Sequence, residues 1–183
     1  MQMRSDEVHA MLDLETLAVC PWAIILSVGA VAFRPNGEIV DKFYRNVDPK
    51  SCMDIGLIAD PNVAEWWAHP DREEARKAFN TDKRPILDVI DEFGTWFNRN
   101  GCSRVWGHGA SFDIPIWETA CRFGKKPFPW HFKYVRDTRT VFDMADVEFS
   151  ALKKEGAYHN ALDDAINQTK ALTDCLQALE VLS

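Results

Sequence analysis

The segment Met11-Leu12-Asp13-Leu14-Glu15-Thr16-Leu17 carries the strongest structural signal in the chain. The residues just upstream, from Val8 to Leu12, are mostly apolar, which is typical of a buried strand. Positions i and i+2 of a strand project from one face, so the carboxylates of Asp13 and Glu15 are expected side by side. Two like charges on a core element are strongly unfavourable unless a cation lies between them. The simplest partner for this strand is therefore a divalent metal ion.

Strand and helix patterns extend outward from this segment in a consistent order. The sequence predicts strands at 8–14, 24–33 and 39–47, helical spacing over 61–79, a helix over 85–97, a short strand at 104–106, a helix over 112–123, a short strand at 134–136, a helix capped by Asp137 and running through 145, and a helix over 161–179. Three antiparallel strands followed by alternating strands and helices predict an α/β fold. We expect a mixed five-stranded sheet with helices on both faces, as in ribonuclease H-like folds.

Length and composition predict one folded domain over residues 1–183. Five cysteines, far apart and without a CxxC pair, argue against a disulfide framework or a structural zinc. Residues 1–7 contain no apolar signal core, and the apolar run over 23–33 is too short to cross a bilayer. The sequence therefore predicts a cytoplasmic protein without a membrane partner.

The formal net charge of −7 disfavours a nucleic-acid partner at first sight, because phosphate contacts need Lys and Arg. Carboxylates that hold metal ions, however, count toward this charge although they become part of a cation-bearing site once loaded. The global charge therefore does not exclude such a partner.

Two further segments offer carboxylates that a loop or helix end could bring to Asp13 and Glu15. The first, GHGASFDI (residues 107–114), is a loop of small residues that leaves a strand and places Asp113 in the first turn of a helix. Sites in α/β sheets commonly collect at such strand ends. The second, HNALDDA (residues 159–165), begins the last helix. If Asn160 caps this helix, Asp163 takes a structural position and Asp164 is left for the site.

MLDLETLA (residues 11–18), GHGASFDI and HNALDDA, in that order, resemble the three motifs of the DnaQ-like 3′-to-5′ exonucleases whose third motif carries a histidine. The resemblance spans nearly the whole chain and is nearest to small phage and bacterial exonucleases or exoribonucleases. It implies Asp13, Glu15, Asp113 and Asp164 as metal ligands and catalytic residues, together with His159. Many relatives have Asn beside the small residues of the second motif, where this chain has His108 and Gly109, which leaves the local hydrogen bonding open.

The resemblance also implies a mechanism. Two hard cations roughly 3.5–4 Å apart can orient a nucleophilic water and stabilise the leaving 3′ oxygen of a phosphodiester. Mg²⁺ and Mn²⁺ prefer oxygen ligands, so four carboxylates suit two ions of either kind. His159 is the candidate general base, because imidazole titrates near neutral pH.

The implied activity is removal of nucleoside 5′-monophosphates from single-stranded nucleic acid or 3′ overhangs. RNA and DNA both remain open as substrates, as does a homodimer, since small relatives often pair. Three alternatives also stay open: a ribonuclease of short oligonucleotides, a ribonuclease H-like endonuclease, and a catalytically weak nucleic-acid-binding or polymerase-accessory module of the same fold.

Substrate contacts are expected from residues next to the motifs, namely Thr16, Leu17, His108 and Phe112. Trp66, Trp67, Trp106 and Trp130 are most simply core residues, with a stacking platform for bases as the alternative. A basic and aromatic stretch from Arg122 to Arg139 would suit a strand-binding rim or a solvated loop equally well.

Overall fold

The computed structural model describes residues 4–152, 156 and 159–182, and its centre is a mixed five-stranded sheet. The strands are β1 (Val8–Thr16), β2 (Ile25–Phe33), β3 (Ile39–Asn46), β4 (Cys102–Gly107) and β5 (Val135–Asp137), in the spatial order β3-β2-β1-β4-β5. β1, β2 and β3 pair antiparallel, whereas β4 pairs parallel to β1 and to β5. This topology confirms the predicted sheet.

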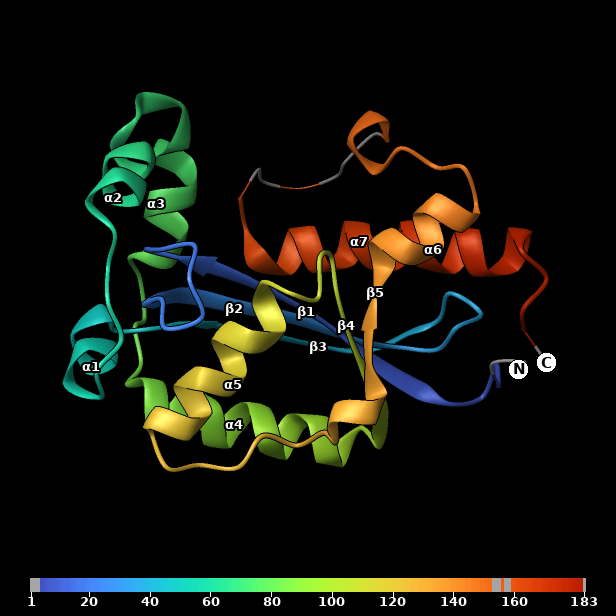
Figure 1. Cartoon of the computed structure of the whole chain (residues 1–183), viewed down its shortest axis with the longest axis horizontal. Helices are drawn as coiled ribbons and strands as arrows, with labels where there is room; N and C mark the ends of the chain where they lie inside the picture. Colours follow the sequence, from blue (N-terminus) through green and yellow to red (C-terminus); the bar gives the residue numbers. More distant parts are fainter. Residues whose placement is uncertain (1–3, 153–155, 157–158, 183) are drawn as a thin grey trace.

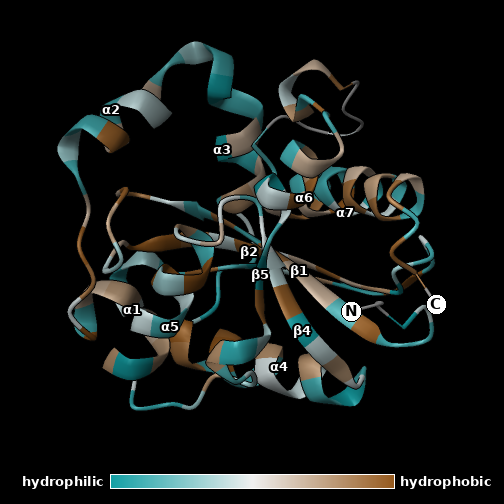
Figure 2. Ribbon diagram, turned by 45° about the vertical axis from the view of Figure 1, so that its right-hand side comes forward, coloured by the Kyte–Doolittle hydropathy of each residue, from teal (hydrophilic) through white to brown (hydrophobic). Residues whose placement is uncertain are grey.

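Helices cover both faces of the sheet (Figure 1). One face carries α6 (Thr138–Met144) and α7 (Ala161–Ala178), and the other carries α4 (Ile86–Arg99) and α5 (Asp113–Phe123). The remaining helices are α1 (Pro49–Asp54), α2 (Pro61–Ala68) and α3 (Glu73–Phe79), with short 3₁₀ turns at 70–72, 132–134 and 149–151. Along α4 and α7 the ribbon alternates between hydrophilic and hydrophobic residues, as expected for helices with one face on a sheet (Figure 2).

Two details of the helices differ from the sequence prediction. The helical stretch over 61–79 is interrupted at His69, because Pro70 disfavours a helical backbone in the residue before it and lacks an N–H donor. The short helix α1 was not expected, although its signal is visible: Asp48 caps it by accepting from the Lys50 backbone N–H, and Pro49 begins it.

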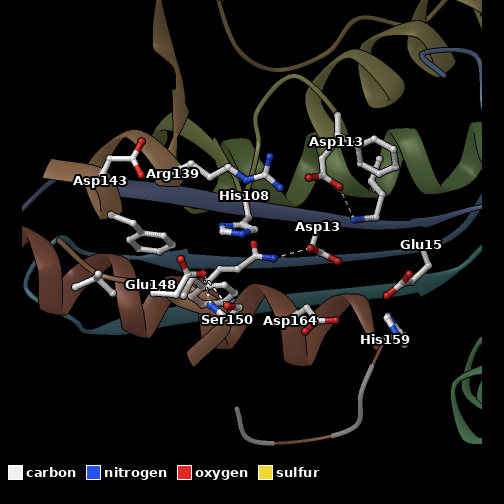
Figure 3. Close-up of a pocket in the computed structure, with 16 residues that line it drawn as sticks. Asp13, Glu15, His108, Asp113, Arg139, Asp143, Glu148, Ser150, His159 and Asp164 are labelled. Carbon is white, nitrogen blue, oxygen red and sulfur yellow. Dashed lines mark hydrogen bonds between the residues drawn. The ribbon is translucent and has the colours of Figure 1, made fainter. Parts of the chain in front are cut away.

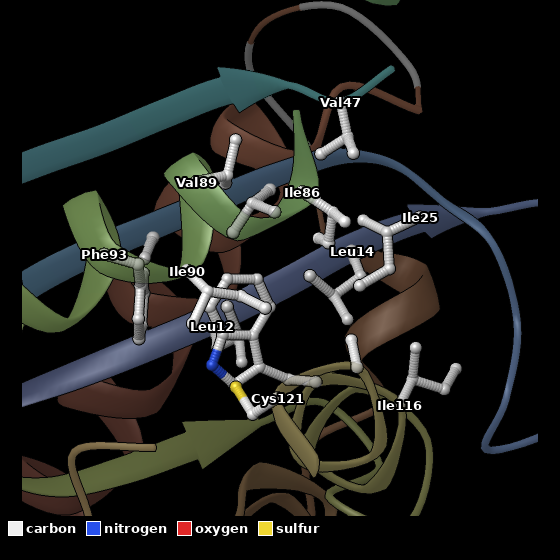
Figure 4. Close-up of a cluster of buried hydrophobic side chains, with 14 of the residues drawn as sticks. Leu12, Leu14, Ile25, Val47, Ile86, Val89, Ile90, Phe93, Ile116 and Cys121 are labelled. Atoms are coloured by element: carbon white, nitrogen blue, oxygen red, sulfur yellow. The ribbon is translucent and has the colours of Figure 1, made fainter. Parts of the chain in front are cut away.

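Side chains of β1 alternate between two hydrophobic clusters, one on each face of the sheet. Leu12 and Leu14 pack with Ile86, Ile90 and Phe93 of α4, in the cluster drawn in Figure 4. Met11 points to the opposite face, where the cluster includes Ala165, Leu172 and Leu176 of α7. Asp13 and Glu15 follow Met11 at intervals of two and therefore share the α7 face.

Among the described residues, none of the helices combines the length and apolar character needed to cross a membrane.

Candidate metal centre

Three carboxylates from two elements meet at the end of β1. Asp13, Glu15 and Asp164 each offer an oxygen, and these oxygens all lie within 4.8 Å of one another. Figure 3 shows Asp13 and Glu15 above the first turns of α7, with Asp164 on the helix below them. The predicted side-by-side arrangement of Asp13 and Glu15 on one strand face is therefore confirmed, and α7 supplies the third acid.

Gly29 allows α7 to approach the sheet at this point. It is the partner of Asp13 in the β1–β2 pairing. A Cβ atom on residue 29 would lie 2.1 Å from the backbone carbon of Ala161 and 2.3 Å from the backbone nitrogen of Leu162. Only glycine leaves room for helix backbone so close to a strand. The first turn of α7 therefore rests directly on the strand position beside Asp13.

The start of α7 is fixed by the cap predicted from the sequence. The side-chain oxygen of Asn160 accepts from the backbone N–H groups of Leu162, at 3.1 Å, and Asp163, at 3.2 Å. This places Asp163 and Asp164 in the first turn, where the partial positive charge of the helix end favours carboxylates. The cap thereby sets the position of Asp164 relative to β1.

Asp113 lies at the start of α5, beside but outside this three-acid group. Its Oδ1 accepts from the backbone N–H of Leu14 at 3.0 Å, which joins the second motif to β1. Burial raises the pKa of Asp113 to about 7, although the hydrogen bond from Leu14 and the positive charge of Arg139 act in the opposite direction. A fourth carboxylate is therefore held within the electrostatic reach of Asp13.

Burial and mutual repulsion shift the pKa values of the strand carboxyls as well. Burial is the largest cause for Asp13, whose pKa is raised well above its ordinary range, and the charges of Asp113, Glu15 and Asp164 add to it. Burial also raises the pKa of Glu15 to about 8, with further contributions from Asp164 and Asp113. Protons or cations must therefore compensate these groups near neutral pH. An all-oxygen donor set of this density fits a hard divalent cation.

His159 lines the same cavity as the carboxylates and immediately precedes the Asn160 cap. Its backbone φ is +59°, in the left-handed region that only a few per cent of non-glycine residues adopt. Its ring makes edge-to-face contacts with Trp66, at 5.0 Å between centroids, and Trp67, at 5.9 Å. The indole N–H of Trp67 donates to the carbonyl oxygen of Thr16 at 2.8 Å. The end of β1 thus anchors the aromatic pair that holds His159.

The predicted burial of the tryptophans is correct for three of the four. Trp67, Trp106 and Trp130 are buried, whereas Trp66 is 41% exposed. Trp66 lies between the His159 ring and the guanidinium of Arg72, whose carbon is 3.6 Å from its ring centroid. Its position depends on how α2 packs over the third motif, and helical spacing carries no information about that contact.

The loop of the second motif is joined to the start of α6. His108 Nδ1 lies 2.9 Å from the hydroxyl of Thr138, and the His108 ring packs at 4.5 Å from that of Phe149. The carboxylate of Asp137 accepts from the backbone N–H groups of Gly109, at 3.2 Å, and Ala110, at 2.9 Å. Asp137 thereby holds the loop in addition to capping α6, the one role expected from the sequence.

A cavity of about 600 Å³ contains all five motif residues. Asp13, Glu15, Asp113, His159 and Asp164 line it, together with His108 and Phe112. Leu17 instead packs between two hydrophobic clusters, and the hydroxyl of Thr16 donates to the carbonyl oxygen of Ala18 at 2.7 Å. Of the four expected substrate contacts, His108 and Phe112 therefore border the cavity, and Thr16 and Leu17 lie outside its lining.

Gln168 is a site residue that the sequence reasoning missed. Its side-chain N–H donates to Oδ1 of Asp13 at 2.7 Å, and the residue is buried. A signal was present, because Gln168 follows Asp164 by one helical turn and so shares its face of α7. A polar residue on the buried stripe of a helix needs a hydrogen-bond partner, and here that partner is the central carboxylate of the site.

Comparisons with known proteins show the family to which this chain belongs. Residues 8–176 match the family described as the 3′-5′ exoribonuclease Rv2179c-like domain. An exodeoxyribonuclease of Enterobacteria phage T4 is 28% identical over 118 residues, which are 57% of this chain and 52% of the phage protein. The match thus spans about half the length of that curated relative.

Solved structures share the fold at low sequence identity. Cell-death related nuclease 4 superposes with a TM-score of 0.62 at 15% identity, covering 97% of this chain and 66% of that one. Exonuclease I of Methylocaldum szegediense gives a TM-score of 0.65 at 10% identity, covering 94% and 40%. E. coli exonuclease I in complex with an oligonucleotide gives 0.61 at 11% identity, covering 96% and 43%. With the three motifs in order and the family match over most of the sequence, the chain belongs to the 3′-5′ exoribonuclease Rv2179c-like family of DnaQ-like exonucleases.

Proposed function

We propose that this protein is a metal-dependent 3′-to-5′ exonuclease that acts on single-stranded nucleic acid or 3′ overhangs and releases nucleoside 5′-monophosphates. The observation that carries the proposal is the group formed by Asp13, Glu15 and Asp164, whose oxygens lie within 4.8 Å of one another in a cavity that also holds His159. Family membership supports the direction of hydrolysis.

The reaction would join the oxygen of a water molecule to the phosphorus of the last phosphodiester and break the bond from phosphorus to the 3′ oxygen. Asp13, Glu15 and Asp164, with Asp113 beside them, would hold two divalent ions, Mg²⁺ or Mn²⁺. When bound, such ions neutralise the phosphate and make water a stronger nucleophile. A ring nitrogen of His159 accepts the proton that the water loses and later releases it to solvent, and the 3′ oxygen takes up a proton from solvent as it leaves. Gln168 keeps Asp13 oriented through its hydrogen bond.

The contacts of His159 support its proposed role as general base. Its ring is held by Trp66 and Trp67 at the mouth of the acid group and lines the same cavity. We expect His159→Ala to lower turnover by roughly 10²–10⁴-fold, the range for a lost general base. Metal affinity, measured by titration calorimetry with Mn²⁺, should remain largely unchanged. Loss of metal affinity in parallel with activity would make His159 a ligand and contradict its role as base.

Purified protein with Mg²⁺ or Mn²⁺ on RNA and DNA of equal sequence, each labelled at the 5′ end, tests the activity. Stepwise shortening to a ladder of products supports 3′-to-5′ hydrolysis, whereas immediate release of the label indicates attack from the 5′ end. Products of one internal size indicate an endonuclease, and binding without cleavage indicates an accessory module. Asp13→Asn keeps the shape of the side chain but removes its charge, and full activity in that variant would refute the proposal.

A further inference from the structure

Arg139, the second residue of α6, occupies a distinctive position in the cavity. Of the described residues that line it, Arg139 alone carries a permanent positive charge, whereas Asp or Glu lines it at six positions. Four of these acids belong to the motifs, and the other two, Asp143 and Glu148, lie on the Arg139 side of the cavity (Figure 3). A nucleic-acid strand that enters here passes six acidic side chains, and Arg139 is the residue of this lining whose fixed charge attracts a phosphate.

The position of Arg139 is determined by the second-motif loop. Its backbone N–H donates to Asp137 Oδ1 at 2.9 Å, and the same carboxylate holds Gly109 and Ala110. Gly109 has a φ of +85°, and a Cβ atom there would lie 3.0 Å from the guanidinium carbon of Arg139. The missing side chain of Gly109 therefore makes room for the guanidinium directly over the loop.

Within the part of the chain that the structure describes, neither a hydrogen bond nor an ion pair engages the guanidinium of Arg139. Two other cations of the same basic stretch have acidic partners: Arg122 pairs with Glu118 at 2.8 Å, and Lys126 pairs with Asp91 at 2.6 Å. Arg122 also lies at the opposite end of α5 from Asp113, about 13 Å along the helix at 1.5 Å per residue. Of the rim expected from the sequence, only Arg139 reaches the cavity.

We propose that Arg139 binds a backbone phosphate of the substrate other than the one that is cut. The scissile phosphate belongs at the acid group, and Figure 3 shows Arg139 at the α6 side of the cavity, beyond Asp113 and Asp13 from Glu15. A guanidinium presents a planar fork of donors that matches phosphate oxygens. This inference rests on the proposed exonuclease function, and it assigns the path of the strand: from the acid group past His108 toward α6.

Two substrates distinguish this contact from chemistry at the scissile phosphate. A single-stranded oligothymidylate carries further phosphates, whereas the p-nitrophenyl ester of thymidine 5′-monophosphate has one phosphodiester only. We expect Arg139→Gln to raise KM for the oligonucleotide roughly 10- to 100-fold, the effect of losing a hydrogen bond to a charged group. The kcat for the oligonucleotide and both constants for the ester should stay within about twofold of wild type, and Arg139→Lys should recover part of the loss.

A binding measurement separates this inference from the activity itself. Binding of a labelled oligothymidylate is measured by fluorescence anisotropy with the Asp164→Asn variant as the background. Addition of Arg139→Gln should weaken binding. It should also reduce the slope of log Kd against log salt concentration by about 0.7, as for one lost phosphate contact. Arg99→Gln, which removes an exposed cation that pairs with Asp41 instead, is the matched control and should leave both unchanged. If Arg139→Gln changed neither the affinity for the oligonucleotide nor the salt slope, the inference would be wrong. It would also be wrong if Arg139→Gln reduced kcat/KM equally for the oligonucleotide and the ester. A wild-type protein that binds through Arg139 but cleaves neither substrate would contradict only the proposed function.

Discussion

Replacement of Gly29 by alanine is the sharpest test of how the fold builds the site. An added Cβ would lie 2.1–2.3 Å from three backbone atoms of Ala161 and Leu162, whereas ordinary contact begins at 3.4 Å. None of these atoms belongs to a flexible side chain, so α7 must retreat from β2 by roughly 1 Å or more to restore normal packing. The backbone of residue 29 itself is extended strand, which alanine adopts without strain.

The displacement should weaken both stability and activity. Overpacking a close contact typically costs about 1–3 kcal/mol, which corresponds to a melting temperature lower by roughly 2–12 °C for a chain of this size. Because Gly29 pairs with Asp13, the retreat of α7 moves Asp164 and His159 away from the strand acids. A misplacement of 1 Å can reduce turnover by about 100-fold.

The assay combines thermal unfolding, Mn²⁺ titration and hydrolysis of the p-nitrophenyl ester. Gly94→Ala is the matched control, because a Cβ on residue 94 of α4 would have no heavy atom within 4 Å. That substitution should stabilise the helix by roughly 0.5–1 kcal/mol and leave turnover unchanged. If Gly29→Ala kept wild-type turnover and Mn²⁺ affinity, the spacing between β2 and α7 would not set the site, and the reasoning would be wrong.

Three further predictions concern groups around the acids. Trp66→Ala should lower kcat about 2- to 12-fold, the value of one aromatic contact, with KM unchanged because the loss acts through His159; Trp66→Phe should restore kcat. Gln168→Leu removes the donor to Asp13 and should weaken Mn²⁺ affinity roughly 10- to 100-fold by calorimetry. The pKa of Glu15 is raised from 4.5 to about 8, so its contribution to stability is complete below about pH 4.5 and is lost as pH rises toward 8. The melting temperature of the metal-free protein should therefore fall between about pH 4.5 and pH 8, and it should fall less steeply in Glu15→Gln. Mn²⁺ should raise the melting temperature most at the alkaline end of this pH range.

The sequence predicts the parts of the fold that depend on local periodicity. The two-residue repeat of β1 places Asp13 and Glu15 on one face, and the Asn160 cap fixes which of two adjacent acids, Asp163 or Asp164, turns toward them. Both features are set within a few residues of chain. Asp113 reaches the same strand end because it follows β4, which pairs parallel with β1, and Asp164 reaches it from the first turn of α7.

Contacts between elements distant in sequence were beyond such reasoning. Trp66 has helical spacing like any core residue, and only the packing of α2 over the third motif shows that it holds His159. Arg139 looked like one of several cations in a basic stretch, and only the tertiary structure shows that it lines the cavity while Lys126 pairs with Asp91 of α4. In each case the decisive information is a side-chain partner on another element.

The group formed by Asp13, Glu15 and Asp164 is a continuation of the core rather than an addition to it. On the α7 face of β1, Met11 packs against the apolar stripe of α7, and Asp13 and Glu15 continue the same row beyond the point where that stripe ends. The helix that covers the core with Ala165 and Leu172 also carries Asp164, immediately before Ala165, and Gln168, between the two core residues. Because one helix serves both purposes, anything that shifts α7 for reasons of packing must also change the spacing of the carboxylates. Binding of a cation should in turn tighten α7 against the sheet, so that metal affinity and stability rise and fall together.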